Sequence, residues 1–249
     1  GRSEPGSRRN GTELMTYKVI NFQGETLHCH LSGALVWPST QTVIVSDLHL
    51  EKGSAFAQRG ILLPPYDSRD SLNNLAVVLK NSSANRVICL GDSFHDQSAF
   101  ERLGIEEISL IQRMTTFRDW IWITGNHDPD PPTHLGGQVS MEFALGPITF
   151  RHIAKPQANM GEVSGHYHPK ARVSVRGQYL SAPCFITDGK KLILPAFGAY
   201  TGGLDVTDPA IDVHFKKGYN VHLLGQQKVF SFPKNALSKK RRHEANMIL

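Results

Sequence analysis

The sequence predicts an α/β fold in four layers, an α/β/β/α sandwich in which two mixed sheets pack face to face and helices flank them. In the first half of the chain, strand-like and helical segments alternate, which favours a largely parallel sheet with crossover helices. After about residue 138 the helical pattern fades and short strands follow, which favours a mostly antiparallel second sheet. A length of 249 residues suits one such domain with a buried core.

In the first half, residues 17–36 alternate around Gln23-Gly24, which predicts a β-hairpin. Short apolar runs predict buried strands over 42–46, 86–90 and 120–124. Between the strands we expect a loop over 51–66 that ends at Pro64-Pro65, a helix from Ser68 or Asp70 to about Lys80, and a helix over 98–118 interrupted near Gly104.

In the second half, short strands are expected over 140–145, 148–153, 161–167, 171–177, 184–189 and 191–197. The whole of residues 15–238 is expected to form a single domain. Residues 1–14 are expected to be a leader outside the fold, and residues 239–249 a basic tail.

Composition points to an ordinary cytoplasmic protein. The net charge is +5, but +1 lies in residues 1–14 and +3 in residues 239–249, so the domain itself carries only +1 and charge alone does not establish a nucleic-acid-binding face. No apolar run approaches the ~20 residues of a membrane span, and residues 1–14 lack the apolar core of a secretory signal. The three cysteines form no CxxC pair, which favours buried reduced thiols.

Asp, Asn and His side chains, whose oxygen and nitrogen atoms can bind metal ions, come directly after the predicted strands. Glycines beside several of them allow sharp turns, and ligands at the carboxyl ends of strands form a crevice in open α/β sheets. The expected metal ligands are Asp47, His49, Asp92, Asn126, His152, His166 and His168.

This donor set contains imidazole, carboxylate and amide groups but no thiolate, which suits Mn, Fe or Zn and suits Ca poorly. Asp47 and His49 are two residues apart and would point the same way on an extended segment. Asp92 has two oxygens and could bridge two ions. Two divalent ions ~3.5–4 Å apart would activate a water molecule and spread the charge of a phosphate ester under attack. The sequence therefore predicts hydrolysis of a phosphoester.

Other residues are candidates for proton transfer and substrate binding. His127 is the natural proton donor to the leaving oxygen. His95 and Asp96 could orient His127, although capping of their loop by hydrogen bonds is the alternative. The candidate substrate contacts are Lys52, Arg59, Tyr66 and Tyr200, for which a solvated loop or a glycine-rich turn is the alternative.

The ordered motifs SDLHL, GDSFHD, GNHD, a lone His152 and GHYH resemble the calcineurin-like metallophosphoesterase superfamily. The resemblance covers about residues 42–205. It implies that Asp47, His49 and His168 bind one ion, that Asn126, His152 and His166 bind the other, that Asp92 bridges them, and that His127 is the catalytic acid. No ligand position is missing.

A narrower similarity joins the segment from Ser46 to Arg69, GDSFHD and LPAFGAYTGGLDV to the bacterial DNA ligase-associated metallophosphoesterases. It implies two divalent transition-metal ions, with Mn first and Fe or Zn as alternatives. It also implies a phosphodiesterase in DNA repair, with nucleic-acid ends or cyclic nucleotides as substrates and a DNA ligase or helicase as partner.

Two alternatives remain. A phosphomonoesterase or nucleotide pyrophosphatase could use the same ions. A non-catalytic scaffold of the same fold usually lacks the catalytic histidine or several ligands, whereas this sequence has them all.

Overall fold

The computed structural model describes residues 16–58, 60–61, 67–96, 98–128, 130, 133–156, 161–175, 177–199 and 201–238. Three of the candidate substrate contacts, Arg59, Tyr66 and Tyr200, lie outside these residues, as do the whole leader and the whole basic tail. No helix in the described ranges is long and apolar enough to cross a bilayer.

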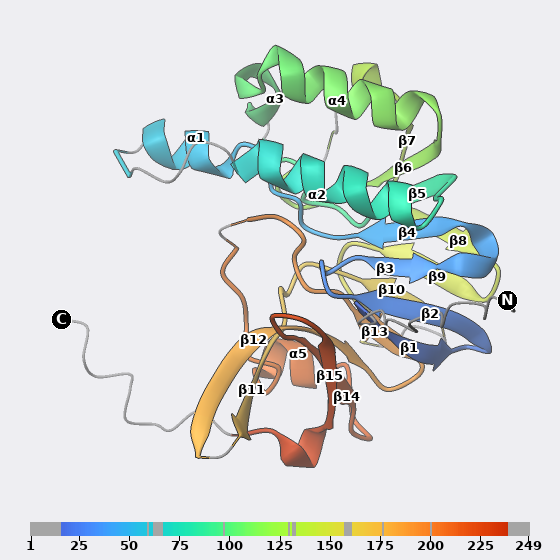
Figure 1. Ribbon diagram of the computed structural model, residues 1–249, viewed down its shortest axis with the longest axis vertical. Helices are drawn as coiled ribbons and strands as arrows, with labels where there is room; N and C mark the ends of the chain where they lie inside the picture. The colour runs from blue at the N-terminus through green and yellow to red at the C-terminus, as the bar shows by residue number, and fades with distance from the viewer. Residues whose placement is uncertain are drawn as a thin grey trace, which may run out of the picture.

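The first sheet has the strand order β1-β2-β3-β4-β5-β6-β7 (Figure 1). The pairs from β1 to β4 are antiparallel, and those from β4 to β7 are parallel. Its strands are β1 Tyr17–Phe22, β2 Glu25–His30, β3 Leu35–Trp37, β4 Thr42–Val45, β5 Arg86–Cys89, β6 Asp119–Ile123 and β7 Gln138–Ser140.

The second sheet has the order β15-β14-β12-β13-β10-β9-β8, with β11 paired to β12. It is mostly antiparallel, but β10 pairs parallel with both β9 and β13. Its strands are β8 Glu142–Leu145, β9 Ile148–Arg151, β10 Glu162–Ser164, β11 Lys170–Val175, β12 Gln178–Thr187, β13 Lys191–Ile193, β14 Asn220–Leu224 and β15 Val229–Pro233.

Helices cover the outer faces unequally. The longer α2 and α4 lie together over the outer face of the first sheet (Figure 1). The helices are α1 Lys52–Gln58, α2 Asp67–Asn81, α3 Ala99–Arg102, α4 Ile105–Thr116 and α5 Pro209–Asp212, with 3₁₀ turns η1 Pro38–Thr40, η2 Thr133–Leu135 and η3 Lys234–Ala236. Among the described residues, the only helix that covers the outer face of the second sheet is α5, which is a single turn.

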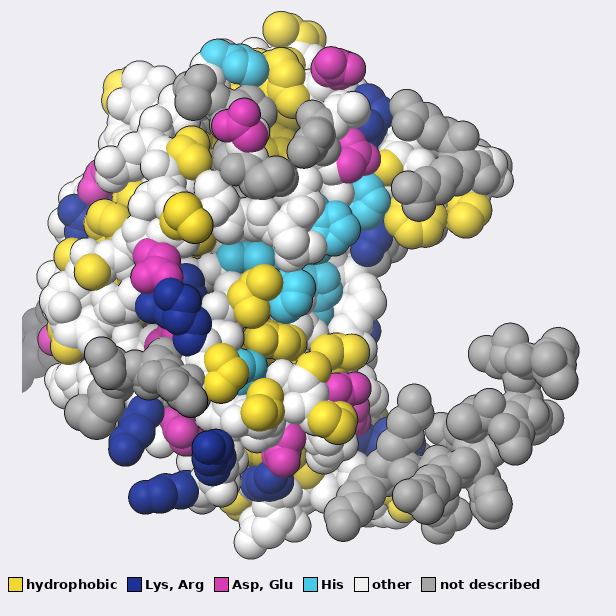
Figure 2. All heavy atoms as spheres, turned by 180° about the vertical axis from the view of Figure 1, so that it is seen from behind, with side chains coloured by type: hydrophobic (Ala, Val, Ile, Leu, Met, Phe, Trp, Pro, Cys, Tyr) yellow, Lys and Arg dark blue, Asp and Glu magenta, His cyan; other side chains and the backbone are white. Residues whose placement is uncertain are grey.

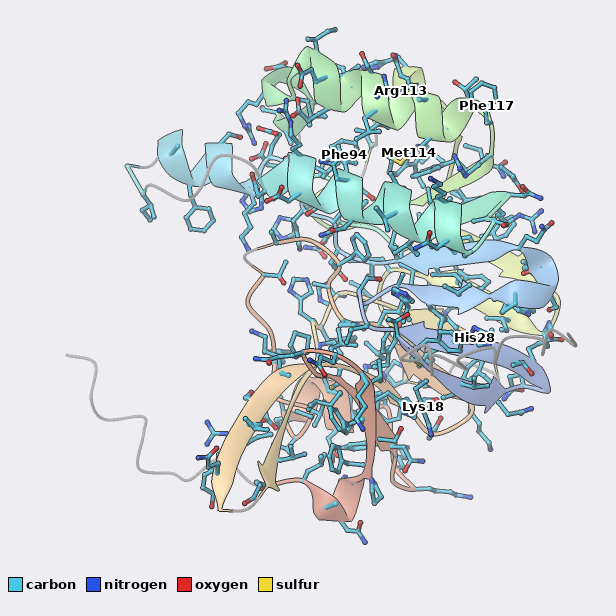
Figure 3. The ribbon with its side chains drawn as sticks, viewed as in Figure 1. Lys18, His28, Phe94, Arg113, Met114 and Phe117 are labelled. Atoms are coloured by element: carbon cyan, nitrogen blue, oxygen red, sulfur yellow. The ribbon has the colours of Figure 1, made fainter. Side chains whose placement is uncertain are left out.

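Apolar side chains on the central strands point alternately to the two faces of the sheet, and each face packs against a different layer. Val43 and Val45 on β4 pack against α2 and α4, in the core that also holds Phe94 and Met114 (Figure 3), whereas Ile44 points to the opposite face. Ile44 packs in the core between the two sheets together with Phe185 of β12. A third core lies on the outer face of the second sheet, under Ile211 of α5. Successive side chains of a strand point to opposite faces, so three cores separate four layers.

The predicted fold class is confirmed, and most elements lie where the sequence predicts them. The expected loop over 51–66 is wrong in its first part, because α1 forms there. Strands β14 and β15 have no counterpart in the sequence prediction, which ended at residue 197. All three cysteines are buried and unpaired, as expected.

Candidate metal centre

The predicted ligands meet because both sheets present the carboxyl ends of parallel strands at one edge. Strands β4, β5 and β6 run parallel in the first sheet, and β9 and β10 run parallel in the second. Asp47 and His49 follow β4, Asp92 follows β5, and Asn126 follows β6; His152 follows β9, and His166 and His168 follow β10. Figure 2 shows the resulting group of histidine side chains in a hollow of one face of the molecule.

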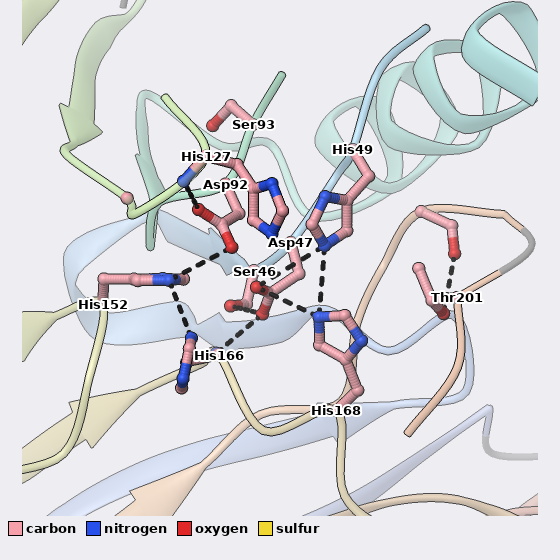
Figure 4. Close-up of polar contacts among 12 residues, drawn as sticks. Ser46, Asp47, His49, Asp92, Ser93, His127, His152, His166, His168 and Thr201 are labelled. Atoms are coloured by element: carbon pink, nitrogen blue, oxygen red, sulfur yellow. Dashed lines mark hydrogen bonds and ion pairs between the residues drawn. The ribbon is translucent and has the colours of Figure 1, made fainter. Parts of the chain in front are cut away.

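One cluster consists of Asp47, His49 and His168 (Figure 4). Asp47 Oδ1 lies 3.2 Å from His168 Nε2 and 4.0 Å from His49 Nε2, and the two Nε2 atoms are 3.2 Å apart. Burial lowers the pKa of His49 to about 4, so that its ring is neutral and able to donate a lone pair. Burial alone would raise the pKa of Asp47, but its interactions with His168, His152 and Ser46 together lower that pKa.

A second cluster consists of Asp92, His152 and His166, with Asn126 beside it. His152 Nε2 lies 2.9 Å from Asn126 Oδ1, 3.2 Å from His166 Nδ1 and 3.3 Å from Asp92 Oδ2. Burial alone would raise the pKa of Asp92, but the hydrogen bonds and charges of His152 and His127 together lower the pKa to about 2. The carboxylate is therefore ionised at neutral pH.

The two clusters are in direct contact. The backbone N–H of His166, from the second cluster, donates to Asp47 Oδ2, in the first, over 2.9 Å. The charge of Asp92 acts on His49 across the boundary. Such an arrangement places two candidate ion sites side by side.

The donor groups fit divalent cations. Asp47 Oδ1 is buried and accepts no hydrogen bond from any residue that the structure describes, which is costly unless a positive charge lies against it. His152 Nδ1 lies 2.7 Å from the carbonyl oxygen of Leu90, so an N–H there donates outward and leaves the Nε2 lone pair facing the cluster. This outward hydrogen bond is how proteins orient metal-binding histidines.

The ligand segments use a left-handed backbone. Asp47, His49, Asp92, His166 and His168 all have φ between +45° and +73°. Asp and His enter this region more readily than most residues. The segment of Asp47 and His49 is thus not extended, so the reason given for their pointing the same way was wrong. Both side chains nevertheless enter one cluster.

Comparison with known proteins identifies the family. The profile described as Calcineurin-like phosphoesterase matches residues 40–210, which include every residue of both clusters. The chain belongs to this family. It is therefore a metal-dependent hydrolase of phosphoesters.

One solved structure supports the fold, and a second is a weaker match. The Pseudomonas putida nuclease MPE is similar to this phosphoesterase with a TM-score of 0.68 and 26% identity, over 87% of this chain and 100% of that chain. Yfce, a phosphoesterase from E. coli, matches with a TM-score of 0.41 and 14% identity, over 79% of this chain and 99% of that chain. No curated protein matches the chain significantly.

A cavity of about 370 Å³ opens over the two clusters of the phosphoesterase. His127 lines it, held by its backbone N–H, which donates to Asp92 Oδ1 over 2.9 Å. The ring of His95 stacks near that of His127, with centroids 5.9 Å apart and planes 17° apart. The structure thus brings His95 to His127 through ring packing, and no hydrogen bond joins the two side chains.

Asp96 and Lys52 also line this cavity, but they differ in their partners. The carboxylate of Asp96 accepts hydrogen bonds from Arg102 Nη2, at 2.8 Å, and from the Ser98 N–H, at 2.9 Å. The side chain of Asp96 therefore bonds to the start of α3 and not to His127. This is the alternative role of capping the loop by hydrogen bonds. Lys52 points its ammonium group over the Phe56 ring, 5.9 Å from the centroid.

Asp128, the last residue of GNHD, is a functional residue that the sequence did not predict. Its side chain is 3% exposed, and its carboxylate accepts hydrogen bonds from the backbone of both the Asp92 loop and Gly125. The sequence signal that could have revealed it is a carboxylate directly beside predicted ligands at the end of a buried strand.

Proposed function

We propose that this phosphoesterase is a two-metal phosphodiesterase that acts on nucleic-acid ends or cyclic nucleotides. The observation that carries the proposal is the contact between two ligand clusters beneath one open cavity. The similarity in fold to a nuclease of Pseudomonas putida supports a nucleic-acid diester as substrate.

In this proposal Asp47, His49 and His168 hold one ion, and Asn126, His152 and His166 hold the other. Asp92, whose charge reaches both clusters, would be a ligand shared by the two ions. Two divalent ions supply the activated water and neutralise the phosphate charge. Mn²⁺ suits this mixture of imidazole and oxygen ligands, with Fe²⁺ and Zn²⁺ as alternatives.

His127 is the proposed proton donor to the leaving oxygen. Its ring lies in the cavity wall, with its centroid 5.5 Å from that of His49, so it borders the position that a substrate phosphate would take. The hydrogen bond from its backbone N–H to Asp92 Oδ1 holds this segment beside the second cluster. General acids of this kind typically contribute 10²- to 10⁴-fold.

A phosphodiester is favoured over a phosphomonoester because the cavity contains Lys52 and Phe56 beyond the ligand clusters, leaving room for a group on each side of the phosphate. We also propose a role in DNA repair beside a DNA ligase or helicase, which follows from the motif resemblance. A phosphomonoesterase that uses the same ions is the alternative.

The test begins with removal of metal by a chelator and addition of Mn²⁺, Fe²⁺ or Zn²⁺ separately. Hydrolysis is then measured on bis(p-nitrophenyl) phosphate, p-nitrophenyl phosphate, a cyclic nucleotide and a DNA oligonucleotide. We expect Mn²⁺ to restore diester hydrolysis most strongly. Faster hydrolysis of the monoester would favour the alternative, and no metal-restored hydrolysis would refute the proposal.

Two variants connect activity to the ligand clusters. Asp92→Ala should lose both bound metal and diester hydrolysis. Asp119→Ala is the matched control, because this carboxylate pairs with Arg86 at the opposite end of the sheet. Retention of stoichiometric metal by Asp92→Ala would contradict its place between the ions.

A further inference from the structure

Helix α1 forms the wall of the cavity beyond the ligand clusters and contributes Lys52 and Phe56 to its lining. These residues are four apart, so they lie on the same face of the helix. One face therefore presents a cationic group and a flat apolar ring together, with Lys52 Nζ 5.9 Å from the ring centroid. Neither residue belongs to the proposed ligand set or to the proton donor.

The ammonium group of Lys52 has no carboxylate partner within salt-bridge distance among the residues that the structure describes. Burial lowers the pKa of this ammonium group, and the charge of Asp67 opposes the effect. The acid that shares the cavity wall, Asp96, is already paired with Arg102. Lys52 is thus left able to pair with an anionic group of a ligand.

Phe56 is only partly buried and belongs to no hydrophobic core of the described residues. Its ring centroid lies 6.0 Å from that of His95, which in turn stacks near His127. The three rings form a row from α1 to the proposed proton donor. A flat group attached to the reacting phosphate could lie along this row.

The wall is held in place by side chains from three segments. Arg102 of α3 donates from Nε to Ser54 Oγ, at 2.9 Å, and from Nη2 to Asp96, at 2.8 Å. The backbone N–H of Gly53 donates to Asp67 Oδ2, at 2.7 Å. Because α1 is fixed at two points, its ring and ammonium group keep their positions relative to the ligand clusters.

We propose that α1 is the nucleoside subsite of the enzyme, in which Phe56 stacks on the base joined to the scissile phosphate and Lys52 binds the next phosphate along the strand. This inference rests on the proposed phosphodiesterase function and deepens it. The recognised unit is a nucleotide within a strand or at its end. The stacking selects a base without reading its identity, because every base has a flat face.

Three diesters with the same leaving group test the subsite: methyl p-nitrophenyl phosphate, thymidine 5′-(p-nitrophenyl phosphate) and its 3′-phosphorylated form. In the Mn²⁺-loaded enzyme we expect kcat/KM to rise in that order. Phe56→Leu should reduce the ratio between the thymidine and methyl esters by roughly tenfold. Lys52→Gln should reduce the ratio between the 3′-phosphorylated and unphosphorylated thymidine esters.

Both substrates of a ratio are measured on the same preparation of enzyme. A loss of active enzyme through partial misfolding therefore lowers both rates equally and leaves the ratio unchanged. Phe56→Tyr, which retains a flat ring, should restore the thymidine preference. Phe117→Leu, at a ring 81% exposed beyond α4, and Lys80→Gln, at the end of α2, are the matched controls and should leave all ratios unchanged.

The results separate the subsite from the proposed function. If the methyl ester is hydrolysed but the wild-type enzyme shows no preference for the thymidine ester, or if Phe56→Leu and Lys52→Gln preserve both ratios, the subsite is refuted and the phosphodiesterase stands. If none of the three diesters is hydrolysed with Mn²⁺, the proposed function itself fails.

Discussion

The carboxylate of Asp128 holds the backbone of Asp92 in place through a hydrogen bond of 2.9 Å between Asp92 N–H and Asp128 Oδ1. The same carboxylate accepts from Ser93 at 2.8 Å, from Phe94 at 3.2 Å and from Gly125 at 3.1 Å. One buried side chain thus organises the loop after β5 and the loop after β6. Both loops carry proposed ligands, so their separation depends on Asp128.

Asp128→Asn should therefore weaken metal binding and activity without removing any proposed ligand. Its amide group would present hydrogens to two backbone donors that now meet an acceptor. Outer hydrogen-bond partners of ligands typically contribute about 10- to 100-fold in affinity or activity. Metal content and kcat/KM measure the effect. Asp188→Asn is the control, since Asp188 also accepts from two backbone N–H groups but in an exposed turn. Equal behaviour of the two variants would contradict the organising role.

Gly165→Ala should disrupt the first cluster. A Cβ at this position would overlap Ser46 Oγ and approach Asp47 Oδ2 to 2.7 Å, so the buried carboxylate would have to move. We expect loss of metal from the purified variant and activity at least tenfold lower, by analogy with other displaced ligand supports. Gly202→Ala is the matched control, because nothing lies within 4 Å of its Cβ position. Normal metal content in Gly165→Ala would show that the site tolerates the shift.

His127→Ala should reduce turnover most for diesters with poor leaving groups. A nitrophenolate departs without protonation, whereas an alkoxide from a sugar needs a proton in the transition state. We expect a loss of about 10²- to 10⁴-fold on a dinucleotide and a much smaller loss on a p-nitrophenyl ester. Metal content should stay near that of the wild type. An equal loss on both substrates would argue that His127 does not donate the proton.

Unfolding should depend on pH through His222, a buried residue of β14 whose Nδ1 lies 2.8 Å from Ser231 Oγ. Burial, with a further contribution from Lys18 of β1 (Figure 3), lowers its pKa to about 4. The unfolded chain binds a proton at this residue between pH 6.5 and 4, whereas the folded chain does not. Its stabilising contribution is therefore complete above pH 6.5 and is lost as the pH falls towards 4.

A group with such a shift contributes up to about 3 kcal/mol over this window. In urea unfolding at pH 7.5 and pH 4.5, His222→Asn should lose less stability on acidification than the wild type. His134→Asn replaces an exposed histidine and should lose as much stability on acidification as the wild type. If His222→Asn and the wild type lose equal stability, His222 is not the group that titrates.

The strands that carry the site were predictable because their patterns are local. The apolar runs before Asp47, Asp92 and Asn126 end where the ligands begin, and the structure has β4, β5 and β6 there. Helix α1 was not predictable, because its start depends on distant residues. Asp67 accepts from the N–H of Gly53, and Ser68 accepts from the N–H of Glu51, so the first turn of α2 caps the first turn of α1.

By itself, the sequence determined the chemistry of the donors and their position at the ends of strands, since both depend on residue type and short-range periodicity. Local patterns did not indicate which donors meet; the family resemblance implied the grouping, and the tertiary structure shows the contacts. Asp47 contacts His168 across 121 positions, and Asp96 pairs with Arg102. The tertiary structure also gave Asp128 its role and brought α1 to the cavity. The physical reason is that such contacts depend on the order and register of strands in two packed sheets, which local patterns do not encode.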